Sequence, residues 1–287
     1  MTAATTQTAS RKPLPPSPCV GICTMDQQAE LCAGCGRSAL EIAGWSASNA
    51  EDKQRVWGVL PERLAGLGVN SFRLSQDPQA IASFVVETVV SRAGVWSIAG
   101  GPEFAPAWFD TSSAGITVAS VDAAITAVTD EAAVRIMKHD RVRIFGFSAE
   151  RGSGVIEQVA LVLPRGRALL AVHDQVTHCG TDTDAVRTAD RDLELIDLGG
   201  GCDTARVCQR VARENTADAD GHSGASGRGT QIAVSAVGRI ETAQNLHGRP
   251  VPRAVRAMGT VPSAFAICAM FTPHDAEWLK AVLPAGG

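Results

Sequence analysis

The pattern of polar and apolar positions divides the chain into three stretches. Residues 1–16 are small, polar and proline-rich, and they predict a disordered tail without the apolar stretch of a secretory signal. Residues 17–68 contain clustered cysteines followed by helical patterns. Residues 69–287 contain most of the β-branched runs and therefore most of the expected strands. We therefore expect a tail, a small module and a larger domain.

Two short helices are predicted in the small module. Each has a serine followed three residues later by a glutamate, which is the spacing of a capping box. These pairs are Ser38–Glu41 and Ser48–Glu51. The second helix has an apolar face at helical spacing, formed by Val56, Trp57 and Leu60. Pro61 and the glycines after it are expected to end this helix.

Strands outnumber helices in residues 69–287 and do not alternate with them regularly. This order predicts an α+β domain with a mixed, mostly antiparallel sheet rather than a doubly wound one. Strands are expected at about 95–99, 115–119, 141–147, 155–163, 168–172, 193–198, 231–236 and 263–271. Helices are expected at about 77–92 and 203–214, with a polar loop at 215–229.

Composition narrows the function classes. Of the 287 residues, 45% are hydrophobic and 20% are charged, the net charge is −4, and no block of like charge occurs. A dedicated nucleic-acid surface is therefore not expected, because phosphate binding depends on clustered Lys and Arg. No run approaches the roughly 18–20 apolar residues that span a bilayer. We expect a cytoplasmic protein whose eight cysteines stay reduced.

Four of these cysteines form the strongest motif. Cys19, Cys23, Cys32 and Cys35 follow the pattern C-x3-C-x8-C-x2-C. Two close pairs separated by a short loop can place four sulfurs at the corners of one tetrahedron, which is the geometry of structural zinc sites. Iron–sulfur clusters use the same four thiolates. We expect zinc ahead of an iron–sulfur cluster.

The residues around the second pair support this prediction. Gly34 and Gly36 can adopt positive φ, which lets the backbone turn tightly and direct amides at the sulfurs. Four thiolates around Zn²⁺ leave about two negative charges. Arg37 and the N-terminus of the helix that Ser38 caps are placed to offset them.

The run PCVGIC…LCAGCGRSALEIAGW is similar to the YdhL-like family of small bacterial domains of unknown function, DUF1289. The matching residues are Pro18, the four cysteines, Gly34, Gly36, Arg37, Glu41, Ile42 and Trp45. The resemblance covers about residues 17–65 and implies a bacterial, cytoplasmic metal module. The family is described as iron–sulfur from its cysteine spacing, and the resemblance implies no known reaction. We expect Trp45 to pack over the metal loop.

The glycines 199–201 are the main candidate for a second site. An apolar strand ending at Asp197 leads into them, and a helix is expected to begin at Asp203. This order resembles the nucleotide loop of adenosylmethionine-dependent methyltransferases. However, Asp203 replaces the third glycine of that loop, and too few residues follow to complete its sheet. We interpret the glycines as a tight turn and expect no adenosylmethionine binding.

Other polar and thiol groups fit no ligand pattern. They are His173, His178, Cys179, Cys202, His222 and His247. Ser153 is interpreted as part of a hairpin turn, and Cys208 and Cys268 as buried core residues. The segments VWSIAGGPEF, VALVLPRG, ADRDLELIDLGGG and VGRIE are loosely similar to an uncharacterised bacterial family over about residues 90–275.

The main hypothesis is a structural or interaction module that binds metal, fused to an uncharacterised α+β domain. A protein partner is possible, whereas a membrane is not expected. Two alternatives from the enzyme class stay open: an iron–sulfur redox protein, and a small-molecule transferase acting through the larger domain. No catalytic residue is assigned. The larger domain is expected to fold without the metal.

Overall fold

A computed structural model describes most of the chain. The described residues are 15–98, 106–108, 115–121, 124–129, 132–150, 155–169, 193–197, 203–212, 230–243 and 260–283. The predicted tail and the predicted loop at 215–229 therefore lie almost entirely outside them.

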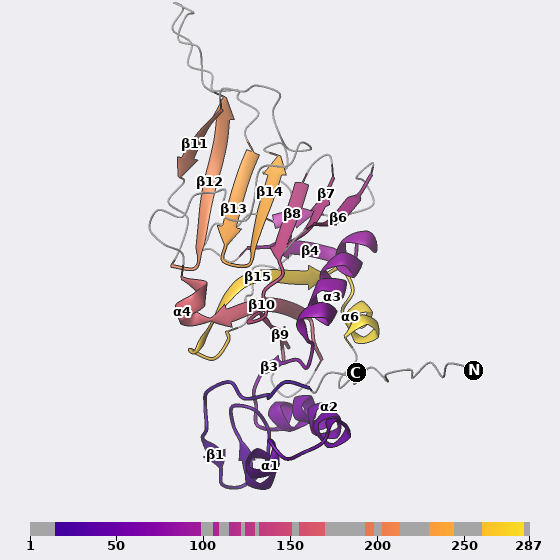
Figure 1. The fold of residues 1–287 in the computed structure, drawn as a ribbon, viewed down its shortest axis with the longest axis vertical. Coiled ribbons are helices and arrows are strands. Elements are labelled where there is room, and N and C mark those ends of the chain that lie inside the picture. Colours follow the sequence, from indigo (N-terminus) through magenta and orange to yellow (C-terminus); the bar gives the residue numbers. More distant parts are fainter. Residues whose placement is uncertain are drawn as a thin grey trace, which may run out of the picture.

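The N-terminal module contains a small hairpin and two helices, drawn in indigo in Figure 1. Its elements are β1 (Met25–Asp26), β2 (Leu31–Cys32), α1 (Ala39–Gly44) and α2 (Ala50–Gly66). The hairpin strands pair antiparallel, with Met25 opposite Cys32. The chain thus enters the second cysteine pair directly from a strand.

One of the two predicted capping boxes is confirmed. The Ser38 side chain accepts a bond from the Glu41 amide, and the Glu41 carboxylate accepts one from the Ser38 amide. The second prediction is wrong, because Asn49 caps α2 by accepting from the Asp52 amide. The Ser48 hydroxyl donates instead to the Gly44 carbonyl in the preceding helix. Asn competes as well as Ser for an N-cap, and here it lies one residue nearer the helix.

Helix α2 continues through Pro61 and ends at Gly66, so one of the glycines expected to end the helix does so and the proline does not. A proline inside a helix removes one backbone hydrogen bond. The last turn nevertheless buries Leu64 and Ala65, and this packing offsets the loss. Of the predicted apolar face, Trp57 and Leu60 are buried.

The larger part contains two antiparallel sheets. The six-stranded sheet has the order β3-β9-β10-β15-β4-β5. Its strands are β3 (Ser71–Arg73), β9 (Arg143–Phe147), β10 (Gln158–Pro164), β15 (Phe265–Pro273), β4 (Gly94–Ser97) and β5 (Pro106–Trp108). The seven-stranded sheet has the order β11-β12-β13-β14-β8-β7-β6. Its strands are β11 (Leu193–Asp197), β12 (Ala205–Ala212), β13 (Thr230–Ser235), β14 (Gly238–Ala243), β8 (Ala132–Met137), β7 (Ala124–Val128) and β6 (Thr117–Val121).

The predicted α+β class with mostly antiparallel strands is confirmed. Every pairing among the described strands is antiparallel, so the parallel pairing of a mixed sheet is not seen in this part of the chain. The expected single sheet is instead two sheets, whose strands run across one another in Figure 1. The module lies at the end of the molecule that carries the six-stranded sheet.

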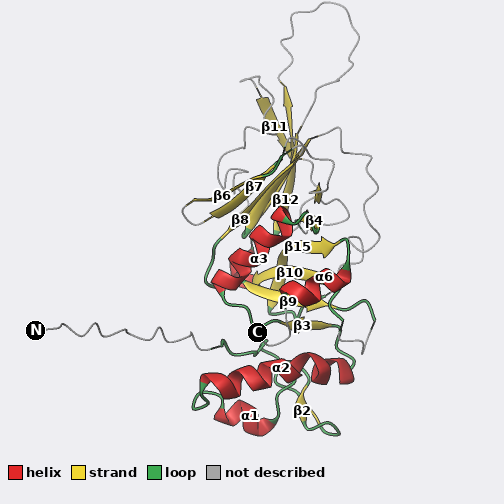
Figure 2. Cartoon of the chain, turned by 90° about the vertical axis from the view of Figure 1, so that its right-hand side faces the viewer, coloured by secondary structure: helices red, strands yellow, loops and turns green. Residues whose placement is uncertain are grey.

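One apolar core joins the two sheets. It includes Trp96 and Leu161 from the six-stranded sheet, and Val134 and Ile240 from the seven-stranded sheet. Helices α3 (Pro78–Val90) and α6 (Ala276–Val282) contribute to the same core and lie on one side of the molecule in Figure 2. Asp77 caps α3 as the sequence predicts.

The helix expected at 203–214 is wrong, because this segment forms β12. Asp203 does not cap a helix, and its carboxylate pairs with Arg165 at 3.1 Å. Strand β12 is paired on both sides, by β11 and β13, and this tertiary pairing overrides the helical spacing of its apolar residues. The strand expected at 168–172 falls partly on α4 (Arg165–Ala168) and otherwise outside the described residues.

Candidate metal centre

The second cysteine pair lies in a tight turn. The Cys35 and Gly36 amides both donate to the Cys32 carbonyl, and the Cys32 amide donates to the Arg37 carbonyl at 2.8 Å. Gly36 has φ of +71°, as predicted, and packs against Leu60 and Leu64 of α2. The turn is thereby fixed to the main helix of the module.

Gly34 is required for a different reason from the predicted one. Its φ is not positive, but a Cβ at this position would lie 2.3 Å from the carbonyl oxygen of Ile22. The two cysteine loops therefore approach each other backbone to backbone, which only glycine permits. This close approach brings the loop of Cys19 and Cys23 beside the turn of Cys32 and Cys35.

The four thiols differ in exposure and in hydrogen bonding. Cys32 and Cys35 are buried, Cys19 is half-buried and Cys23 is exposed. The Gly21 amide donates to Cys19 Sγ, and Arg37 Nε donates to Cys35 Sγ, both at 3.4 Å. The Cys32 thiol donates to the Ile22 carbonyl at 3.3 Å, which only its protonated form can do. Two sulfurs thus already accept N–H bonds of the kind that stabilise thiolates.

The thiols influence one another electrostatically. The pKa of Cys23 is raised above its ordinary value, first by the charge of Cys19 and then by burial and by Cys32. Burial raises the pKa of Cys35, although Arg37 acts in the opposite direction. Mutual repulsion of this kind requires that the ionised sulfurs lie near one another. A cation placed among them would remove the repulsion.

Arg37 links the cysteines to Trp45. Its guanidinium lies 4.8 Å from the centre of the Trp45 ring, and Lys53 Nζ lies 5.7 Å from it. Both cations are buried, at 4% and 6% exposure. Trp45 therefore covers two buried cations, of which Arg37 also donates to Cys35 Sγ, and its packing over the metal loop itself stays a prediction.

Two residues of this region were not singled out from the sequence. Arg73 of β3 donates to the backbone carbonyls of Ser17 and Cys19. Burial and the neighbouring Arg143 lower its pKa to about 10, whereas Cys19 acts to raise it. Val20, inside the Cys19–Cys23 loop, is buried against the six-stranded sheet. A valine in a short polar loop is a weak signal, and Arg73 gives no signal in the sequence.

Within the described residues, no three histidine, cysteine, aspartate or glutamate side chains are grouped as a metal ion requires. The four cysteines form two neighbouring pairs instead, and Cys32 is turned to the Ile22 carbonyl. The donor set itself, four sulfurs and nearby N–H donors, suits zinc or iron.

The other candidates do not gather into a site. Ser153, His173, His178, Cys179, Gly199–Gly201, Cys202, His222 and His247 lie outside the described residues. Cys208 and Cys268 are buried among apolar neighbours, as predicted. Because residues 205–212 form a strand, the helix that a nucleotide loop requires after the glycines is missing from this position. The adenosylmethionine interpretation therefore loses its main structural element.

The comparison with protein families covers both parts of the chain. The profile of a family of unknown function, DUF6925, matches residues 80–265, more than half of the chain. The chain belongs to the DUF6925 family. A second profile, for the protein of unknown function DUF1289, matches residues 17–64, which confirms the resemblance predicted for the module. No curated protein and no solved structure matches the chain.

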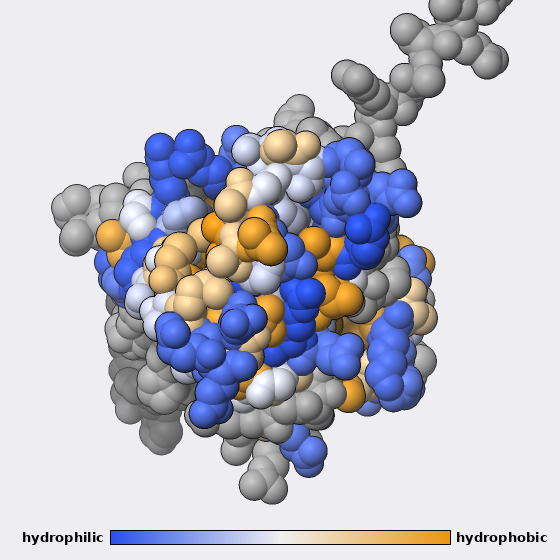
Figure 3. Space-filling model, turned by 90° about the horizontal axis from the view of Figure 1, so that it is seen from below, coloured by the Kyte–Doolittle hydropathy of each residue, from blue (hydrophilic) through white to orange (hydrophobic). Residues whose placement is uncertain are grey.

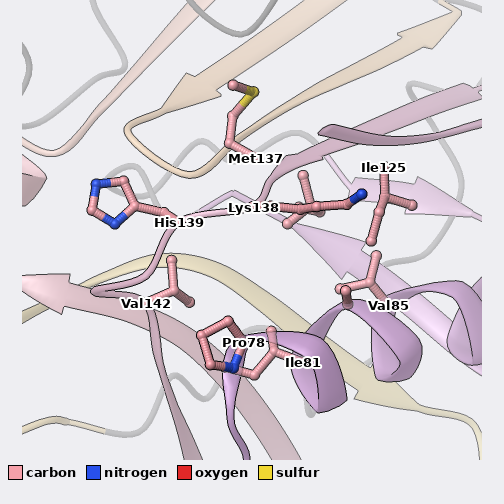
Figure 4. Close-up of a pocket in the computed structure, with 10 residues that line it drawn as sticks. Pro78, Ile81, Val85, Ile125, Met137, Lys138, His139 and Val142 are labelled. Carbon is pink, nitrogen blue, oxygen red and sulfur yellow. The ribbon is translucent and has the colours of Figure 1, made fainter. Parts of the chain in front are cut away.

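A small apolar hollow lies between α3 and strands β7 and β8 of the seven-stranded sheet. Its walls include Ile81, Val85 and Ile125, and Lys138 and His139 lie at its rim. In Figure 4 the last two side chains point to opposite sides, so they do not converge on one ligand. The space open to the centre of a water molecule is about 10 Å³, which holds about one water.

No helix in the described part of the DUF6925 protein is long and apolar enough to cross a membrane. Figure 3 views the molecule from the end formed by the module and shows hydrophobic surface in separate patches among hydrophilic ones. Among the described residues, the most exposed large apolar side chain is Leu40 of α1, at 85% exposure.

Proposed function

We propose that this DUF6925 protein binds one metal centre through Cys19, Cys23, Cys32 and Cys35, with zinc favoured over an iron–sulfur cluster. The observation that best supports this proposal is the close approach of the two cysteine loops at Gly34, where the Ile22 carbonyl leaves no room for a side chain. The contact brings the loop of Cys19 and Cys23 beside the turn of Cys32 and Cys35. A cytoplasmic location, in which thiols stay reduced, accords with this role.

Charge supports the same proposal. Four thiolates around a divalent cation carry about two negative charges, and nearby N–H donors and cations must offset them. Arg37 donates to Cys35 Sγ, and Gly21 donates to Cys19 Sγ. The raised pKa of Cys23 and of Cys35 disfavours the thiolate form at these two positions. A bound cation supplies the positive charge that lets them ionise.

A structural role is favoured over a catalytic one. Four sulfur ligands fill a tetrahedral site and leave no position for substrate. The module is also small, and α1 buries none of its residues. Metal binding can supply the folding free energy that such a core lacks. An interaction partner for the module and an enzymatic activity of the DUF6925 domain remain predictions without a specific observation in their favour.

The iron–sulfur alternative rests on the same four thiolates. Absorption near 400 nm separates the two, because an iron–sulfur centre absorbs there and zinc does not. The protein must be purified without oxygen for this comparison to be valid.

Elemental analysis of the purified full-length protein tests the proposal. We expect about one zinc per chain in the wild type and near-complete loss in Cys23→Ser. Cys23 is exposed, so its substitution leaves the core intact and metal loss reports ligation. Cys208→Ala, a buried cysteine of β12 outside the module, is the matched control and keeps the metal. Equal metal content in wild type and Cys23→Ser would overturn the assignment.

A further inference from the structure

The loop between the first two cysteines is docked on the larger domain. Val20 is only 3% exposed and packs with Phe145, Phe147, Ala160, Val162 and Met270. These residues come from β9, β10 and β15 of the six-stranded sheet. At the next residue, Gly21, an added Cβ would lie 3.7 Å from the Ala264 Cβ, which is ordinary van der Waals contact.

The face that Val20 covers is the outer face of the sheet. In β10, Val159, Leu161 and Leu163 point into the main core, so Ala160 and Val162 point the opposite way. An antiparallel sheet can leave one such face to solvent, but this face is apolar. The Val20 side chain is therefore the part of the module that closes it.

Arg73 fastens the same loop from the sheet side. It is the register partner of Phe145, so its side chain lies on the outer face beside Val20. Its guanidinium donates to the carbonyl of Ser17 and to that of Cys19, the first cysteine. Its Nε is buried and has no hydrogen-bond partner in the described part of the chain. The groups that act on its charge are Arg143, Arg37 and Cys19, and of these only Cys19 is acidic.

A buried guanidinium without a carboxylate is costly unless another negative charge lies near it. Deprotonated Cys19, as a ligand in a four-thiolate centre with excess negative charge, is such a group. Arg73 is thus a positioning residue that belongs to the larger domain and serves the cysteine site.

We propose that metal binding at the four cysteines locks the Cys19–Cys23 loop onto the outer face of the six-stranded sheet, so that metal loading controls the exposure of this apolar face. This inference rests on the proposed metal site. The main core between the two sheets contains no residue of the module, so the larger domain stays folded when the metal leaves. Only the outer face, around β9 and β10, opens.

Thermodynamic linkage makes the effect reciprocal. If the metal favours the docked loop by a given factor, the docked loop must favour the metal by the same factor. Removing the Val20 contact should therefore weaken metal binding although Val20 is not a ligand. Losing the burial of one valine side chain corresponds to a factor of roughly tenfold or more.

Hydrogen exchange of the full-length protein, read by mass spectrometry, tests the inference with and without a strong chelator. We expect chelation to raise amide exchange in β9 and β10 about tenfold or more while β13 and β14 stay protected. Val20→Ala with metal bound should raise exchange in the same two strands. Ile22→Ala is the matched control, since Ile22 lies in the same loop but is 39% exposed, and it should change neither.

Metal competition with a chromophoric chelator supplies the second readout. Val20→Ala and Arg73→Met should each weaken metal retention about tenfold, whereas Ile22→Ala and Arg141→Met should not, because Arg141 is an exposed arginine in the turn before β9. Unchanged exchange in β9 and β10 after chelation of a protein that does contain metal would overturn the inference and leave the metal site intact. Absence of metal from the wild type would instead overturn the proposed function. Unchanged amide exchange and unchanged metal retention in Val20→Ala would show that docking of the loop does not affect metal binding, and would overturn the inference.

Discussion

Cys23 is the residue at which the electrostatics of the cysteine cluster can be measured. It is exposed, yet its pKa is raised, and the largest cause is the neighbouring Cys19. Cys35 differs, because burial is the largest cause of its raised pKa. Removing Cys19 should therefore lower the pKa of Cys23 and leave that of Cys35 unchanged.

In the metal-free protein, Cys19→Ser should lower the pKa of Cys23 toward its ordinary value. A lower pKa means more thiolate at pH 8, and so faster alkylation of Cys23 by iodoacetamide. Cys35 is the internal control, and its alkylation should not accelerate. Peptide mass spectrometry over a range of pH measures both rates. If Cys23 reacts at the same rate in both proteins, the first two thiols do not lie close together.

The sign of this shift also decides the pH dependence of the module. A thiol whose pKa is raised on folding adds stability below its unfolded pKa, and that stability is lost as the pH rises through the folded pKa. Metal binding has the opposite dependence, because protons compete with the cation for the sulfurs. Metal-free and metal-bound protein should therefore lose stability at opposite ends of the pH range.

At the scale of elements, the cysteine turn and helix α2 form one unit. Arg63 of α2 pairs with Glu41 of α1 at 2.7 Å and also donates to the Gly36 carbonyl. Burial alone would raise the pKa of Glu41, but the bonds from Arg63 and the Ser38 amide hold it below its usual value. These contacts hold both helices against the turn. A substitution that distorts the turn should therefore lower the free energy of unfolding of the module.

Two glycines of this unit give opposite predictions. Gly34→Ala places a Cβ 2.3 Å from the Ile22 oxygen and should destabilise by about 3 kcal/mol, the upper end for overpacking. Gly58→Ala lies inside α2 with nothing within 4 Å and should stabilise by about 0.5–1 kcal/mol. Urea unfolding of the metal-loaded protein, followed by helical circular dichroism, measures both. A neutral Gly34→Ala would mean that the two cysteine loops are not in contact.

The sequence predicts elements with local signals better than those set by tertiary pairing. Asp77-Pro78 and Ser38–Glu41 mark helix starts, and both helices form where expected. Residues 205–212 have apolar residues at helical spacing, and the pairing with β11 and β13, which has no local signal, makes them a strand. Division into two sheets has no local signal, because it depends on which strands meet.

The residues of the candidate metal centre also divide into those with a local signal and those set by tertiary contacts. The four cysteines, Gly36 and Arg37 are predicted from spacing and type, since the residues that make the turn are adjacent in sequence. The Gly34 contact depends on the approach of a loop twelve residues earlier, and Arg73 reaches the site from a strand beyond the module. Val20 and Arg73 become visible only when the two parts of the chain are placed together.

At the scale of the whole molecule, the charge around the cysteines differs from the average. The chain has a net charge of −4, yet Arg37 and Arg73 lie at the cysteine loops and Arg143 lies near Arg73. The first two come from the DUF1289-like module and from the strand that follows it. Arg73 lies between the two family matches, at 17–64 and 80–265, and its guanidinium donates to the Ser17 and Cys19 carbonyls of the first cysteine loop.

X-ray absorption at the metal edge of the purified full-length protein tests the central claim most directly. The account predicts a zinc ion with four sulfur neighbours at about 2.3 Å, lost in Cys23→Ser. Arg73→Met should keep the same four neighbours while binding the ion less tightly. A first coordination sphere dominated by nitrogen or oxygen, or one that persists unchanged in Cys23→Ser, would contradict the assignment of Cys19, Cys23, Cys32 and Cys35 as the ligands.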